Sequence, residues 1–216
     1  MPHGCDLALH RKDRPILNNP DRFREIPALP YAIPFADGTF SIVVSASVLE
    51  HAKNPAECFK EIHRVLKPGG CALHLFPGKW YLPCEPHTLV PMANYFFPHC
   101  PRWWFALWAA LGMSGPSRDG RGWREAARMS ENYYRTGLFY MSSGDHRRLS
   151  RAVFGNCDWP MEFYIAHAQG GMARLCRSLP LPELWGILSR EFRMAFMMQR
   201  KVSEAARTDD RVSDGP

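Results

Sequence analysis

A strand–helix–strand pattern between residues 41 and 76 constrains the fold of this 216-residue chain more than any other feature. Residues 41–45 (Ser-Ile-Val-Val-Ser) are an apolar, β-branched run that follows the turn sequence Asp37-Gly38. Residues 71–76 (Cys-Ala-Leu-His-Leu-Phe) are a second apolar run. Such runs are typical of strands buried on both faces of a parallel sheet. A hairpin with Asp37-Gly38 at its tip is the alternative, and the helix that follows disfavours it.

The segment between the two runs has the residue types of a capped helix. Asn54-Pro55 predicts an N-cap followed by proline at the first helical position, and Glu57 can complete a capping box. Apolar residues then recur at three- and four-residue spacing (Phe59, Ile62, Val65, Leu66) until residues 68–70, Pro-Gly-Gly, end the helix. The pattern predicts a βαβ unit with parallel strands and a right-handed crossover.

The composition indicates an ordinary globular protein with one sizeable core. Hydrophobic residues make up 46% of the chain and charged residues 22%, and the net charge is +6. Seven cysteines are scattered without a C-x-x-C pair, which favours a reducing, cytoplasmic location over a disulfide framework. No leader segment is evident, and the longest apolar run, residues 103–113, is shorter than the roughly 20 residues of a spanning helix.

The C-terminal part of the chain contains further predicted elements. Residues 142–145 (Ser-Ser-Gly-Asp) predict the capped start of a helix, and residues 161–166 are compatible with a strand. Residues 181–189 are compatible with a helix, and residues 193–200 with a last strand. The polar residues 204–216 predict a disordered tail.

Residues 78–140 interrupt this α/β alternation with an aromatic and Arg-rich insertion. Eight arginines and four acids lie between residues 118 and 151, so this part carries +4 of the total charge. The aromatic clusters at 95–97 and 103–105 favour a packed lid or core helix. The alternative is an amphipathic surface that contacts a membrane peripherally or takes up a lipid-like ligand. No nucleic-acid-binding module is visible, so we expect no nucleic-acid partner.

Two motifs carry a family resemblance. Residues 33–51 (Ile-Pro-Phe-Ala-Asp-Gly-Thr-Phe-Ser-Ile-Val-Val-Ser-Ala-Ser-Val-Leu-Glu-His) and residues 61–70 (Glu-Ile-His-Arg-Val-Leu-Lys-Pro-Gly-Gly) resemble class I S-adenosylmethionine (SAM)-dependent methyltransferases. The similar branch is the ubiquinone/menaquinone-methyltransferase type. The resemblance implies a Rossmann-like α/β fold, SAM as the cofactor and one domain over residues 1–203.

The resemblance also implies where the cofactor binds. Ligands of open parallel sheets bind outside the carboxyl ends of the strands, and the strand at residues 41–45 ends there. In the family this strand end lies beside SAM, the residues after it line or support the cleft, and an acid at the end of an earlier strand holds the ribose. The matching residues here are Asp6, Ser45, Ala46, Ser47, Leu49, Glu50 and His51.

Three departures from the family pattern put activity in question. The glycine-rich D-x-G-x-G loop, with the first strand and its helix, has no counterpart here, so the fold is expected to be N-terminally truncated. Residues 28–33 lack the carboxylate that contacts adenine in the family, and Ser41 replaces an aspartate. A chain that begins too late, a non-catalytic remnant and a subunit that needs a partner to bind SAM are therefore alternatives to an active enzyme.

Two histidines are the catalytic candidates. His51 is placed by the resemblance at the cleft, and His87 follows the second strand in Cys84-Glu85-Pro86-His87, where Glu85 could also meet the substrate. A backbone-bonded histidine and an ordinary polar loop are the structural alternatives. Cys84, His87, His99 and Cys100 match no standard zinc spacing, so we expect no metal site. The predicted function is methyl transfer from SAM to a small-molecule or lipid-like acceptor.

Overall fold

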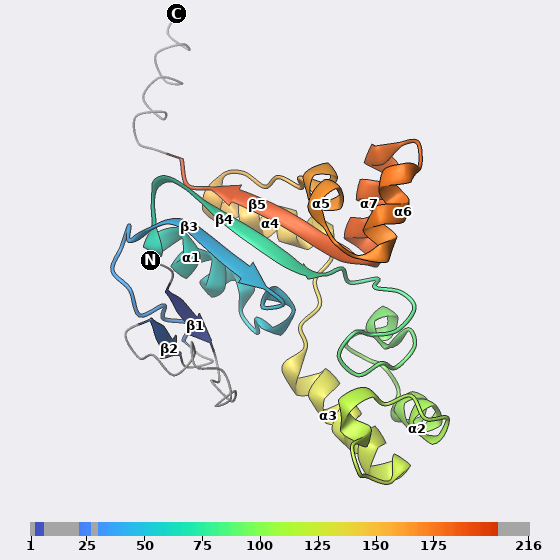
Figure 1. The fold of residues 1–216 in the computed structure, drawn as a ribbon. Coiled ribbons are helices and arrows are strands. Elements are labelled where there is room, and N and C mark those ends of the chain that lie inside the picture. Colours follow the sequence, from blue (N-terminus) through green and yellow to red (C-terminus); the bar gives the residue numbers. More distant parts are fainter. Residues whose placement is uncertain (1–2, 7–21, 27–29, 203–216) are drawn as a thin grey trace, which may run out of the picture.

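A three-stranded sheet organises the larger part of the molecule (Figure 1). The computed structural model describes residues 3–6, 22–26 and 30–202. Within them, the sheet has the order β3 (Phe40–Ala46), β4 (Leu66–Pro77) and β5 (Met194–Arg200). The predicted disordered tail at residues 204–216 lies outside the described residues.

The strand directions confirm the predicted βαβ unit. β3 and β4 are parallel, with Val43 opposite Ala72, which rules out the hairpin. β5 joins β4 antiparallel, with Leu73 opposite Met198, so the predicted last strand is present. Strands of opposite direction on one sheet edge are common in mixed α/β folds.

The helix of the βαβ unit begins where its capping residues predict. α1 (Pro55–Val65) has Asn54 as its N-cap, whose side-chain oxygen accepts a hydrogen bond from the Glu57 N–H at 3.4 Å. A short 3-10 turn, η2 (Leu49–His51), lies between β3 and α1. The chain therefore leaves the sheet through residues 47–54 at the carboxyl end of β3.

The main core lies between the sheet and two helices. α1 and α4 (Ser143–Phe154) contribute Phe59 and Phe154 to it, and β5 contributes Met197. Phe59 and Met197 are fully buried. On the other face of β3, in contrast, Ile42 and Val44 are 58% and 69% exposed.

Arg64 connects the two sequence motifs. Its guanidinium donates to the backbone carbonyls of Ile33 and Phe35, both at about 2.8–2.9 Å, and to the carboxylates of Asp37 and Glu61. The Glu61 carboxylate in turn accepts from the Ile33 N–H. The segment before β3 is thus fixed to α1 by one side-chain network.

Three helices gather beside the start of β5: α5 (Met161–His167), α6 (Gly171–Ser178) and α7 (Pro182–Phe192). α7 confirms the predicted helix and begins with proline. The strand predicted at residues 161–166 is wrong, because this segment is α5. Its buried residues Met161 and Ile165 are four apart, which is helical spacing that the β-favouring Phe-Tyr-Ile content obscured.

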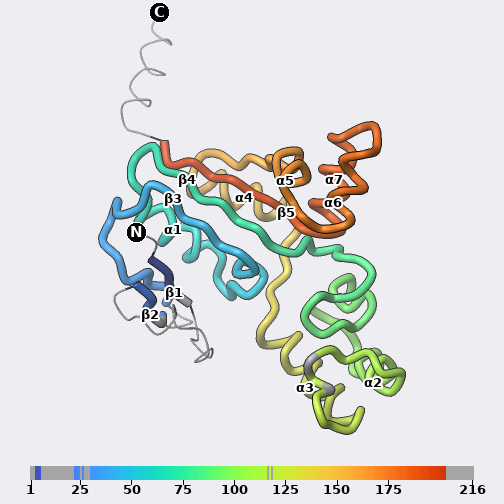
Figure 2. Tube along the Cα trace, in the orientation of Figure 1, coloured from blue at the N-terminus to red at the C-terminus, as the bar shows by residue number. Residues whose placement is uncertain are grey.

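The insertion forms a second lobe with its own core. Figure 2 shows the segment after β4 leaving the sheet and returning only before α4. It contains η3 (Ala93–Phe96), α2 (Arg102–Ala110), η4 (Gly115–Arg118) and α3 (Trp123–Gly137). Phe105, Tyr134 and Leu138 are buried in this second core, whereas Trp103 on α2 and Leu111, which follows α2, are exposed.

A separate pair of short strands precedes the main sheet. β1 (Gly4–Asp6) and β2 (Phe23–Glu25) are parallel to each other, and the structure pairs neither with β3. A strand that ends at Asp6 is therefore present, as the resemblance implies, but it lies outside the main sheet. Among the described residues, no helix combines the length and the apolar character that crossing a membrane requires.

Candidate active site

The carboxyl end of β3 turns sharply at Ser47. This residue has φ 53°, in the left-handed region that side chains other than glycine seldom occupy. Its N–H donates to the Leu75 carbonyl on β4 at 2.8 Å, which keeps the turn attached to the sheet. Strained residues of this kind concentrate at functional sites, and this turn delivers Glu50 and His51 beside the second lobe.

A tight loop after β4 supplies the opposite wall. Glu85 is fully buried there, and its carboxylate accepts hydrogen bonds from the backbone N–H groups of His87 (3.0 Å) and Thr88 (2.6 Å). The hydroxyls of Thr88 and Tyr140 also donate to it, each at 2.7 Å. Burial alone would raise the pKa of Glu85, but these donors outweigh it and lower the pKa to about 2. Glu85 is therefore a permanently charged acceptor.

Glu85 also fixes the ring of His87. The Nδ1 atom of His87 lies 2.8 Å from Glu85 Oε1. Because an ionised carboxylate only accepts hydrogen bonds, Nδ1 carries the proton. The other ring nitrogen, Nε2, faces Glu50 Oε1 at 3.7 Å.

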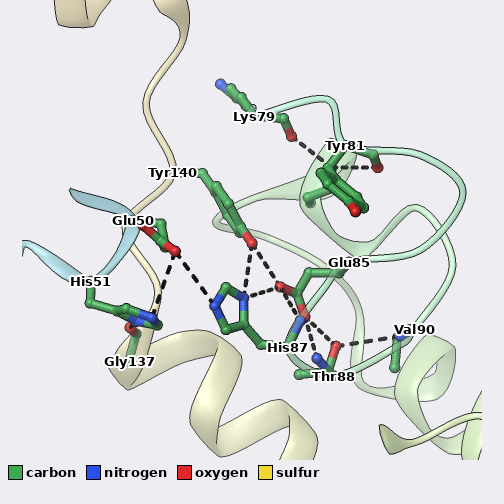
Figure 3. Close-up of polar contacts among 11 residues, drawn as sticks. Glu50, His51, Lys79, Tyr81, Glu85, His87, Thr88, Val90, Gly137 and Tyr140 are labelled. Atoms are coloured by element: carbon green, nitrogen blue, oxygen red, sulfur yellow. Dashed lines mark hydrogen bonds and ion pairs between the residues drawn. The ribbon is translucent and has the colours of Figure 1, made fainter. Parts of the chain in front are cut away.

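His51 has the same arrangement with a different anchor. Its Nδ1 lies 2.7 Å from the carbonyl oxygen of Gly137, at the end of α3, so this nitrogen is the donor. Its Nε2 lies 4.0 Å from Glu50 Oε1. The rings of His51 and His87 meet edge to face with their centroids 4.8 Å apart. Figure 3 shows both rings beside the Glu50 carboxylate.

Glu50 lies between the two imidazoles. Its side chain is 1% exposed, and neither carboxylate oxygen has a hydrogen-bond partner. Burial raises the pKa of Glu50 to about 7, against the smaller lowering effects of its own backbone and of His87. Glu50 and Glu85 thus have pKa values shifted in opposite directions, a pattern that marks functional sites.

The structure brings together three of the residues that the sequence indicated: Glu50, His51 and His87. Leu49 packs in the main core, where it supports the turn. Ser45 is half-buried and its hydroxyl contacts Nδ1 of His74 at 2.7 Å, whereas Ala46 and Ser47 are exposed at the strand end. Asp6 ends β1, and its side chain lies outside the described part of the structure.

One sequence interpretation needs correction, and one disfavoured alternative does not form. Glu85 does not meet a substrate, because it is buried and fully engaged by donors. The set Cys84, His87, His99 and Cys100 does not assemble; among the described residues, the group whose ligand atoms approach within 4.8 Å of one another is Glu50, His51 and His87.

Sequence reasoning missed the tyrosines of the site. Tyr140 closes the Glu85 network from 55 positions away, and the Tyr133 ring packs about 6 Å from both histidine rings. No local pattern marks either residue. The Glu85-Pro-His87-Thr88 spacing was the available signal for the loop, since a side-chain acceptor two and three residues before N–H donors is typical of capped turns.

Part of the chain is similar to known methyltransferases. Residues 5–73 match the family model described as a methyltransferase domain. Over 71 residues the chain is 38% identical to demethylmenaquinone methyltransferase of Chlorobaculum parvum. The aligned segment covers 33% of this chain and 27% of that protein. Over 39 residues it is 51% identical to cycloartenol-C-24-methyltransferase 1 of Oryza sativa subsp. japonica, or 18% of this chain and 11% of that protein.

A solved structure of similar class is the S-adenosylmethionine-dependent methyltransferase of Mesorhizobium loti. It aligns with a TM-score of 0.48 and 18% identity, covering 91% of this chain and 78% of that chain. The matches to the two curated relatives thus span about a quarter of their length or less.

The matched segment includes β1, β3, α1 and most of β4, with the site at the carboxyl end of β3. This segment therefore resembles a methyltransferase domain, and the expected methyltransferase resemblance is confirmed over residues 5–73. The sheet and its helices confirm the expected α/β class.

Proposed function

We propose that this protein transfers the methyl group of SAM to a small-molecule acceptor bound beside Glu50, His51 and His87. The observation that carries the proposal is the position of this cluster. It directly follows the strand end that, by family resemblance, lies beside SAM, and it includes a residue from the insertion lobe. Donor and acceptor sites would therefore adjoin at the carboxyl edge of the sheet.

The strand end supplies the cofactor side of the proposed site. Exposed backbone at Ala46 and Ser47 would contact SAM, and Ser45 would hold the strand end in place through His74. Leu49, packed in the core, would fix the floor of the turn. Asp6 is the proposed ribose ligand on sequence grounds.

The histidines would act on the acceptor. Methyl transfer from a sulfonium is an in-line displacement: the acceptor atom bonds to the methyl carbon, and the carbon–sulfur bond breaks to release the demethylated cofactor. A base helps where the acceptor loses a proton. His87 is suited to accept it at Nε2, because the Glu85 carboxylate at Nδ1 would stabilise the resulting imidazolium. His51 is the second candidate base.

The exposed apolar surface of α2 supports a lipid-like acceptor and peripheral membrane contact. Trp103 and Leu111 are 61% and 64% exposed, and Leu107 lies one helical turn from Trp103 and is 42% exposed. Arginines of the same lobe would meet anionic headgroups. One relative is named a demethylmenaquinone methyltransferase, so a reduced, isoprenoid-bearing naphthoquinone is the first acceptor to test.

Calorimetric titration of the full chain with SAM and with its demethylated product tests the proposal. We expect a dissociation constant in the micromolar range, or about −8 kcal/mol. Transfer of labelled methyl from SAM to reduced demethylmenaquinone in vesicles then tests the acceptor.

Variants separate the two halves of the site. His87→Asn should retain SAM affinity and lose most of the turnover. His167 is exposed at the end of α5 and outside the cluster, so His167→Asn should behave as the original chain. A folded chain that binds neither SAM nor its product would overturn the proposal. It would favour a remnant or a subunit that needs a partner.

A further inference from the structure

The Glu50, His51 and His87 cluster has the donor set of a metal site rather than of an ordinary ion pair. Each residue offers one ligand atom, and these atoms all lie within 4.8 Å of one another. Two separations are 3.7 and 4.0 Å, measured from Glu50 Oε1 to Nε2 of His87 and of His51. Ligands bound at 2.0–2.1 Å to a shared tetrahedral ion lie about 3.3 Å apart, so each histidine nitrogen would need to approach the Glu50 oxygen by less than about 1 Å. The two histidine ligand atoms, which lie within 4.8 Å of each other, would also move together.

Both imidazoles are oriented as metal ligands are. A metal-ligating histidine typically donates its second N–H to a carboxylate or a backbone carbonyl, which fixes the tautomer and aims the other nitrogen at the ion. His87 does this through Glu85 Oε1, and His51 through the Gly137 carbonyl. In each case the nitrogen directed toward Glu50 is Nε2.

The buried carboxylate independently points to a cation. Glu50 has a 1% exposed side chain whose two oxygens lack any hydrogen-bond partner. A buried polar group in that state is costly, and an ion bound to it would remove the cost. Glu85 adds a second negative charge behind His87, so the site is electrostatically suited to a divalent ion. The histidine side chains are 24% and 20% exposed, which gives an ion access.

We propose that Glu50, His51 and His87 bind one divalent transition-metal ion of the zinc class. Two imidazole nitrogens with one carboxylate favour zinc, cobalt, iron or manganese over magnesium, which prefers oxygen ligands. Three protein ligands leave at least one coordination position for water or an oxygen of the acceptor. Only that last role, at the acceptor, rests on the proposed function; the ion site itself does not.

The test is titration of the metal-stripped full chain with Co²⁺, followed by visible absorption, and with Zn²⁺, followed by calorimetry. We expect one ion per chain, with ligand-field absorption of cobalt and no sulfur-to-metal charge-transfer band. Glu50→Gln and His87→Asn should each weaken the affinity at least tenfold. His51→Asn should do the same.

His99→Asn is the matched control. His99 is exposed, lies outside the cluster and belongs to the alternative cysteine-containing set. It should leave metal affinity unchanged, and circular dichroism should show that each variant is folded. A folded original chain that binds no stoichiometric Co²⁺, or unchanged binding in both His51→Asn and His87→Asn, would overturn the proposal. Thiolate charge-transfer absorption that disappears in His99→Asn would also overturn it, in favour of the alternative set.

The metal titration and the SAM titration test the two proposals independently. The metal titration contains no SAM, and SAM calorimetry is run on the metal-stripped chain. Metal binding without SAM binding would remove the proposed function and leave the ion site. SAM binding without metal binding would do the reverse.

Discussion

The Glu85 carboxylate accepts a hydrogen bond from Nδ1 of His87 at 2.8 Å. It also accepts from the backbone N–H groups of His87 and Thr88 and from the hydroxyls of Thr88 and Tyr140. A buried charge is tolerated only when its oxygens are fully engaged, and this carboxylate meets that condition. One side chain therefore shapes the loop and sets the tautomer of a candidate catalytic ring.

Removing that carboxylate should destabilise the protein. For Glu85→Ala we expect a loss of about 2–4 kcal/mol in the free energy of unfolding, because several buried donors lose a charged acceptor. Urea unfolding measures it. The exposed Glu162→Ala in α5 is the control and should cost less than about 1 kcal/mol. Equal effects of the two changes would contradict the role of Glu85.

Two buried histidines predict acid destabilisation. Burial lowers the pKa of His74 to about 4, although its hydrogen bond with Gln199 acts in the opposite direction. Burial, together with the neighbouring His74, also lowers the pKa of His146 to about 4. Their ordinary value is 6.5, so between these limits the unfolded chain binds protons that the folded chain does not. The free energy of unfolding should thus fall as pH decreases from about 6.5 to about 4, by at most about 1.4 kcal/mol per pH unit for each histidine.

Urea unfolding of the Glu50→Gln chain between about pH 7 and pH 5 measures this slope, because the raised pKa of Glu50, about 7, would otherwise add a slope of opposite sign and most other carboxylates titrate below this range. His146→Gln should reduce the slope, and the exposed His167→Gln should not. A free energy of unfolding that stays constant over this range would show that the two rings are not buried in the neutral form.

The left-handed backbone at Ser47 predicts opposite effects of two substitutions. Ser47→Gly should keep or raise the free energy of unfolding, because glycine adopts φ 53° without a steric penalty. Ser47→Val should lower it by about 1–2 kcal/mol, because a β-branched side chain resists this region. Urea unfolding compares the three chains, and equal stability of the two variants would show that the turn is not under this constraint.

Arg64 should not be replaceable by lysine. It reaches two carbonyls and two carboxylates with one planar guanidinium, a geometry that a single ammonium group lacks. Its side chain is 30% exposed, so we expect a loss of only about 1–2 kcal/mol for Arg64→Ala, with Arg64→Lys recovering less than half.

The control for Arg64 is the ion pair of Arg148 with Asp145, in which the arginine side chain is 81% exposed. Arg148→Ala should cost less than about 0.5 kcal/mol in the same unfolding experiment. Full recovery by Arg64→Lys would mean that charge alone, without the forked geometry, fixes the segment before β3.

The sequence predicted those elements whose start is determined by residues close together in the chain. The Asn54 cap and the Ser142 cap mark helices whose signals lie within a few residues, and both are confirmed. The predicted stop at residues 68–70 is wrong, because α1 ends at Val65 and these residues lie within β4. α5 was mistaken because a seven-residue helix offers only one buried pair at helical spacing.

The site was only partly predictable for a related reason. The family motif indicated Glu50 and His51, and position after β4 indicated His87, but nothing local indicated that the three meet. Their meeting depends on contacts over long sequence separations, such as His51 with Gly137 and Tyr140 with Glu85. Tertiary packing, rather than any residue pattern, brings these groups together.

The cluster of Glu50, His51 and His87 joins residues from the two lobes, each of which has its own hydrophobic core. Glu50 and His51 follow a strand of the first core, whereas His87, Gly137 and Tyr140 belong to the insertion lobe, and the Phe139 N–H donates to the Glu50 carbonyl at 2.7 Å. A ligand held by both sets of residues would lock the lobes to each other. Its binding free energy would then add to the cooperativity of unfolding, so that two regions able to open separately would open together.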